Sequence, residues 1–126
     1  MVEILPSPDH VVAIKISGTL TATDYDRIVA EVSAKLARHK RLGILVDMVD
    51  LDDFTLEAGW KDLRYSLSLL GELARFPREA VISDKQWVRA LARIAGPLVP
   101  HVEIQVFGPG ERDAALAWVA DLPPAR

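Results

Sequence analysis

Apolar positions along the 126-residue chain form short runs of β type, separated by longer segments of helical period. Residues 2–5 and 11–16 predict two strands, and the prolines between them favour a tight antiparallel return. The nearly continuous apolar run at 43–49 is typical of a central strand covered on both faces. Residues 80–83 and 102–107 predict two more strands, and the alternation in the second indicates an outer position in the sheet.

Helical period fills the intervals between these strands. Thr21 or Thr23 can cap the first helix, and Gly96-Pro97 is expected to stop the third. The segment Asp50-Leu51-Asp52-Asp53, which is mainly acidic, follows the central strand and is expected to form a loop. The expected helices cover about 21–39, 55–75, 85–95 and 111–122.

The resulting order of elements, ββαβαβαβα, predicts an α/β fold. Consecutive parallel strands need crossover helices, and right-handed crossovers lay these helices over the sheet. We therefore expect a mixed, mostly parallel five-stranded sheet with helices on both faces. No internal repeat or linker interrupts the chain and its length suits one domain, so residues 1–126 are predicted to form a single domain.

Hydrophobic residues make up 50% of the chain and charged residues 26%, a composition that excludes a disordered or low-complexity protein. The absence of cysteine excludes a disulfide framework, thiol catalysis and cysteine-ligated zinc. A net charge of −3 argues against binding of nucleic acid, which needs a basic face. No apolar run approaches the ~20 residues that span a bilayer, and no targeting signal is recognisable, so a cytoplasmic protein is expected.

Ligands of open parallel sheets bind at the carboxyl ends of the strands. The acidic cluster Asp47, Asp50, Asp52 and Asp53 offers oxygen ligands for Mg²⁺ or Ca²⁺ there, but its spacing lacks the glycine and glutamate of an EF-hand loop, and a solvated acidic loop is favoured. No nucleophile is paired with Asp47 or Asp84, so we assign no catalytic residue, no metal and no cofactor. The residues that could line a pocket at this edge are Thr19, Asp47, Thr55, Ser83 and Asp84.

The second and third expected helices carry more apolar surface than a helix needs to cover a sheet. Steps of three and four residues place the large apolar side chains of each helix in one stripe. An ordinary helix layer is the alternative, but a pair of helices that does not seal on the sheet would line a pocket for an apolar ligand. The candidate binding residues on the two helices are Trp60, Leu63, Leu67, Leu70, Trp87 and Leu91.

A basic stretch at 75–93 accompanies these helices in a chain that is acidic overall. Basic amphipathic helices that carry tryptophan are typical of contact with an anionic membrane surface or partner. The alternative is a set of solvated charges on an ordinary helix layer. The candidate basic surface consists of Arg75, Arg78, Lys85, Arg89 and Arg93.

The order of the elements and several short sequence words resemble the SpoIIAA-like family, a branch of the STAS-type fold (sulphate transporter and anti-sigma-factor antagonist). The resemblance extends over essentially the whole chain, and it rests on the words together, since each alone is unspecific. The words are Ile16-Ser17-Gly18-Thr19-Leu20-Thr21, Leu45-Val46-Asp47, Trp60 with Asp62, Asp84-Lys85 with Trp87, and Ala115-Leu116-Ala117-Trp118-Val119.

This resemblance implies a cytoplasmic STAS-type domain, which in regulatory relatives binds a kinase or another protein and is switched by serine phosphorylation. Those relatives carry an Asp-Ser-x-Gly-type motif at the start of the helix after the central strand, where this chain has Phe54-Thr55-Leu56-Glu57. Thr55 is the only hydroxyl nearby, and it also suits a helix N-cap. The family is similar in fold to lipid-carrying CRAL-TRIO domains, which fits a pocket for an apolar ligand.

Three functions follow from these observations. The leading hypothesis is a non-enzymatic STAS-type binding domain whose second and third helices contact a protein partner, a membrane surface or an apolar, lipid-like ligand. The alternative is a phosphorylation-controlled regulator of the anti-sigma-factor-antagonist type with Thr55 as the acceptor, and a small enzyme ranks last. Excess apolar surface also favours a homodimer and peripheral association with a membrane.

Overall fold

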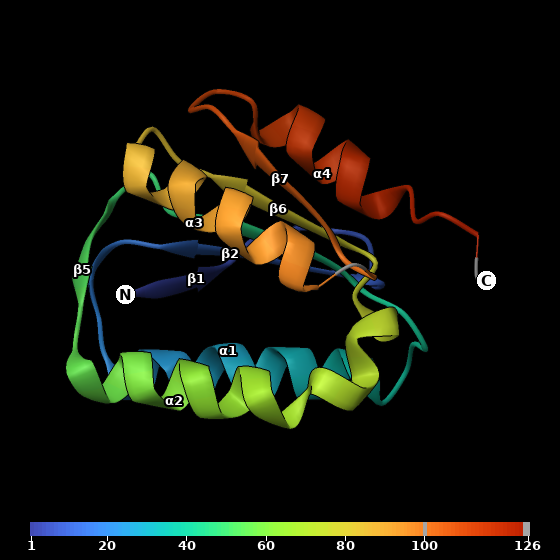
Figure 1. Cartoon of the computed structure of the whole chain (residues 1–126), viewed down its shortest axis with the longest axis horizontal. Coiled ribbons are helices and arrows are strands. Elements are labelled where there is room, and N and C mark those ends of the chain that lie inside the picture. Colours follow the sequence, from blue (N-terminus) through green and yellow to red (C-terminus); the bar gives the residue numbers. More distant parts are fainter. Residues whose placement is uncertain (100, 125–126) are drawn as a thin grey trace.

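A computed structural model describes residues 1–99 and 101–124 of the chain, and of Leu70 the backbone alone. Five strands form the main sheet in the order β1-β2-β4-β6-β7 (Figure 1). The strand β1 is antiparallel to β2, and all other neighbours are parallel, so the predicted mixed, mostly parallel sheet is confirmed. The strands are β1 Val2–Ile4, β2 Val11–Ile16, β4 Gly43–Asp47, β6 Arg78–Ile82 and β7 Glu103–Phe107.

Helices cover both faces of this sheet, as the order of elements predicts. The helix α4 packs against β4 and β6 on one face, whereas α1, α2 and α3 lie on the other (Figure 1). Residues along β2 alternate between the two faces: Val11 and Ala13 join the core under α4, while Val12 and Ile14 join the core under α1. The helices are α1 Ala22–Leu36, α2 Leu56–Ser68, α3 Gln86–Leu98 and α4 Arg112–Ala120.

The prediction of a loop at 50–53 is wrong. Residues 51–53 belong to a strand, β5 Leu51–Phe54, that pairs in parallel with β3 Gly18–Leu20 as a separate two-stranded sheet, and only Asp50 lies in a turn. Gly18 has a φ of +65°, a left-handed conformation that lets the chain leave β2 and begin β3. The side chain of Leu51 is buried, and this burial holds an otherwise acidic strand in place. In Figure 1, β5 runs along the left of the molecule and leads into α2.

The second and third helices also differ from their predicted ranges. The α-helix α2 ends at Ser68, and a 3₁₀ segment, Leu70–Arg75, replaces its expected last turns because Leu69 leaves the helical conformation. The helix α3 continues through Gly96-Pro97 to Leu98. Pro97 lies so close to the helix end that its missing N–H removes a single hydrogen bond on an exposed side of the helix.

Candidate ligand-binding site

A cavity of about 630 Å³ lies between α2, α3 and the sheet. It forms because α2 packs against α1 and α3 packs against β7, so neither helix covers the middle of the sheet. The side chains of Ile44 and Val46 on the central strand line it and remain partly accessible. The volume is in the range of small-molecule sites in proteins.

The lining of this cavity is mainly apolar. Three half-exposed aromatic or aliphatic residues, Phe54, Trp87 and Leu91, contribute to it and therefore form its open rim. Among the described residues, five of the lining side chains are polar, and the others are apolar residues or glycine. The polar ones are Tyr25, Asp62, Tyr65, Ser66 and Glu79.

Glu79 is the polar residue that the sheet itself contributes. It lies on β6 between Ile44 of β4 and Ile104 of β7, which are its partners in the two neighbouring strands. Burial raises the pKa of the Glu79 carboxyl group, and the nearby Asp62 raises it further. An acidic side chain therefore stands in the middle of an apolar surface.

A second polar group lies on the helices opposite. The hydroxyl of Tyr25 on α1 donates a hydrogen bond of 2.7 Å to Oδ1 of Asp62 on α2. Burial, together with this bond to a carboxylate, raises the pKa of Tyr25, so the hydroxyl keeps its proton and acts as a donor. The Tyr25 ring also meets Tyr65 edge to face, with 6.3 Å between the ring centroids. These contacts fix α2 against α1 and hold Asp62 at the cavity.

Sequence analysis did not single out Glu79. The predicted strand began at residue 80, one position too late to include it. A signal was present, because alternation along residues 78–82 places Glu79 and Val81 on the same face of a strand that is covered on both faces. A glutamate at such a position is costly unless something binds it.

The predicted binding residues fall into two groups. Trp87 and Leu91 line the cavity, as described above, and the side chain of Leu70 lies outside the described residues. Trp60, Leu63 and Leu67 point away from the cavity and are 59%, 49% and 56% exposed.

The five residues of the predicted basic surface also fall into two groups, those that contact backbone carbonyls and those that are exposed. Arg75 and Arg78 donate hydrogen bonds to backbone carbonyl groups, as does Lys85, whose acceptors are the carbonyls that follow β4. The guanidinium group of Arg78 also lies 5.0 Å from the centroid of the Trp118 ring. Arg89 and Arg93 on α3 are exposed. Three of the five basic residues thus serve internal contacts.

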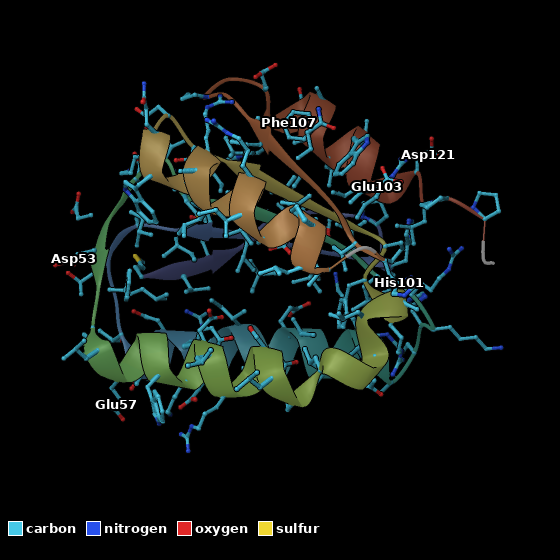
Figure 2. All side chains as sticks on the ribbon, in the orientation of Figure 1. Asp53, Glu57, His101, Glu103, Phe107 and Asp121 are labelled. Carbon is cyan, nitrogen blue, oxygen red and sulfur yellow. The ribbon has the colours of Figure 1, made fainter. Side chains whose placement is uncertain are left out.

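The residues predicted at the carboxyl edge of the sheet are also engaged internally. Asp47 is buried and forms an ion pair of 2.7 Å with Arg112. The hydroxyl of Thr19 donates to Asp53, which lies at the outer edge of the molecule in Figure 2. Thr55 accepts a hydrogen bond from the N–H of Ala58 and so caps α2.

The other two edge residues lie after β6. The buried hydroxyl of Ser83 accepts a bond from the N–H of Lys85, and Asp84 lies 3.9 Å from the Lys85 ammonium group. None of the five predicted edge residues is among those that line the cavity.

The described part of the chain has neither a side-chain cluster for a metal ion nor a helix that could span a membrane. No group of three or more histidine, aspartate or glutamate residues there is placed to hold a metal ion. Within the same residues, no helix combines the length and the apolar character that crossing a membrane requires.

The chain is similar to a described protein family and to solved structures. A family model described as SpoIIAA-like matches residues 11–120. A crystal structure of an uncharacterised protein of the DUF3478 family with a SpoIIAA-like fold, from Shewanella loihica, is 28% identical, with a TM-score of 0.71 over 94% of this chain and 92% of that one. The search of curated proteins finds no match.

A second solved structure shares the fold alone. It is the anti-sigma factor antagonist SpoIIAA in its unphosphorylated form, 14% identical, with a TM-score of 0.67 over 97% of this chain and all of that one.

Proposed function

The chain belongs to the SpoIIAA-like family, and we propose that it is a non-catalytic member that takes an apolar ligand into the cavity between α2, α3 and the sheet. The observation that carries this proposal is the open apolar cavity of about 630 Å³ above the central strands. Apolar side chains on a central strand are normally sealed by the helices above them, and here Ile44 and Val46 remain partly accessible. A ligand would bury this surface.

The proposal is tested by filling the cavity. Ile44→Trp places a large side chain in the cavity, whereas Leu63→Trp adds the same group to the exposed face of α2. We expect wild type and Leu63→Trp to bind the neutral apolar dye Nile red with a saturable increase in fluorescence. Ile44→Trp should lose at least tenfold in affinity, with circular dichroism verifying that both variants are folded. Absence of saturable binding by the wild type, or equal binding by Ile44→Trp, would remove the proposal.

A second candidate function is contact of α2 and α3 with a membrane or protein surface. Leu56, Trp60, Leu63 and Leu67 follow one another along successive turns of α2 and are all exposed, Leu56 to 92%. Ile94 and Leu98 continue the apolar exposure on α3. Such contiguous exposed apolar residues mark interaction surfaces in many proteins.

Vesicle co-sedimentation distinguishes contact with a membrane from contact with a protein. If the surface is a membrane, the protein should sediment with vesicles of phosphatidylcholine and phosphatidylserine, and Leu63→Asp should remain in solution. Binding that does not change in Leu63→Asp would contradict the assignment to this stripe. If the surface is a protein, wild type but not Leu63→Asp should retain the same partner in a pull-down. Size-exclusion chromatography of wild type and Leu63→Asp tests whether this surface forms a homodimer.

A further inference from the structure

The floor of the cavity has a defined charge. Glu79 stands between Ile44 and Ile104 on the sheet, and Asp62 faces the same cavity from α2. Among the described residues that line the cavity there is no lysine, arginine or histidine. The charged groups of the lining are therefore both acidic, with Glu79 partly buried on the sheet and Asp62 exposed on α2, whereas Arg89 and Arg93 of α3 do not line the cavity.

The carboxyl group of Glu79 is available to a ligand. Within the described residues it accepts no hydrogen bond and forms no ion pair, and the causes that shift its pKa are burial and the charge of Asp62. The Tyr25 hydroxyl occupies one oxygen of Asp62, and Oδ2 of Asp62 accepts no hydrogen bond from the described residues. Glu79 is partly buried, and a carboxyl group that is partly removed from water without a partner costs stability, so a bound donor would recover part of that cost.

We propose that the ligand of this cavity is an amphiphile with an apolar body and a cationic amine, and that the ammonium group binds Glu79 and Asp62. This inference rests on the proposed function and adds the chemistry of the ligand's head. An ammonium group provides up to three N–H donors, enough to bond both carboxylates. Charge-assisted bonds of this kind are about twice as strong as neutral ones. The carboxylate of a fatty acid would instead meet two acids with no cation in the lining.

The geometry also explains why the amine would bind inside the cavity and not at its rim. The rim residues Phe54, Trp87 and Leu91 are apolar, and they suit the body of the molecule. Glu79 lies on the sheet that forms the floor. The charged head would therefore enter first, and the apolar body would fill the space between α2 and α3.

Calorimetric titration of the full chain at pH 7 with three ligands of equal chain length tests this inference. The ligands are dodecylamine, dodecanol and dodecanoate, each below its critical micelle concentration. We expect dodecylamine to bind at least tenfold more tightly than dodecanoate, a difference of about 1.4 kcal/mol. Dodecanol should lie between the two.

Two charge-matched variants locate the effect. Glu79→Gln should reduce the affinity for dodecylamine at least tenfold and leave that for dodecanol within about twofold. Glu3→Gln removes the same charge from an exposed position on β1 and should change neither affinity. The wild-type ligand preference supplies a readout that does not depend on the folding of either variant.

The outcomes separate this inference from the proposed function. Binding of dodecanoate as tight as that of dodecylamine, or an amine preference that survives in Glu79→Gln, would overturn the amine assignment while the apolar site stands. If none of the three ligands binds, both the amine assignment and the proposed function fail.

Discussion

The guanidinium group of Arg75 connects the end of the 3₁₀ segment to the carboxyl end of α1. It donates hydrogen bonds to the backbone carbonyls of Leu36, His39 and Lys40 at 2.8, 2.9 and 2.9 Å. These carbonyls lie at or just beyond the last turn of α1, where helical partners are missing, and a cation there is favoured by the helix dipole. Arg75→Ala removes all three bonds at once, so its effect on stability measures this connection directly.

The expected loss follows from the number and exposure of these bonds. A hydrogen bond to a charged donor contributes ~1.5–3 kcal/mol when buried, but the Arg75 side chain is 32% exposed and water can replace part of it. We therefore count about 0.5–1 kcal/mol for each bond and expect Arg75→Ala to lower the free energy of unfolding by about 2 kcal/mol. For a domain of this size, the corresponding fall in Tm is about 6–10 °C.

Urea unfolding at pH 7 measures this loss, and Arg89→Ala is the matched control. Arg89 is exposed on α3, so its replacement should change the free energy of unfolding by less than about 0.5 kcal/mol. Arg75 also lies 3.6 Å from the carboxylate of Glu72, but its three hydrogen-bond acceptors are neutral carbonyls, so high salt should leave most of the difference intact. If Arg75→Ala unfolds like the wild type, or if Arg89→Ala loses as much, then Arg75 does not have this structural role.

Three further substitutions test other parts of the structure. Thr55→Ala should lower the free energy of unfolding by about 1 kcal/mol in urea titrations because it removes the N-cap of α2, while Thr55→Asp should retain the cap. Glu79→Gln should stabilise the ligand-free protein at pH 7 and not at pH 3. Burial raises the pKa of Glu79 in the folded protein, so its protonated form favours folding at low pH. This contribution is lost as the pH rises from the pKa of the unfolded chain through that of the folded protein. Gly43→Ala should cost about 3 kcal/mol by thermal unfolding, since its Cβ would clash with the backbone carbonyl of Val119, whereas Gly96→Ala meets open space and should be harmless.

The main sheet was predictable from sequence because its signals are local and agree with one another. The apolar run at 43–49 predicts a central strand, and β4 lies in the middle of the sheet. Thr21, one of two predicted caps, forms a capping box with Asp24 at the start of α1. The small sheet of β3 and β5 was missed because the acidic composition of 50–53 outweighs its single buried leucine, and its pairing depends on a segment more than thirty residues earlier.

The candidate site was predictable only in part, because periodicity finds the apolar stripe of a helix without showing which way the stripe faces. On α2, the stripe that includes Trp60 and Leu63 faces solvent, while the face with Asp62 and Tyr65 lines the cavity. The amphipathic pattern is thus reversed relative to a helix that seals a core. The position of a helix relative to the sheet depends on tertiary contacts with α1, and no local pattern in the sequence encodes it.

The exposed leucines of α2 and the acid Glu79 at the cavity both reduce the stability of the chain. Together they support the proposal that the cavity binds a ligand and is not merely a poorly packed core. A poorly packed core would still turn its leucines inward, whereas α2 exposes them and presents Asp62 to the cavity. An unused cavity would have an apolar floor, whereas β6 places Glu79 there between two isoleucines. Each arrangement breaks a rule that folding alone would satisfy, and such departures concentrate at functional sites. An amphiphile with an amine head would satisfy the acidic floor, and the exposed stripe on α2 would remain for a second surface.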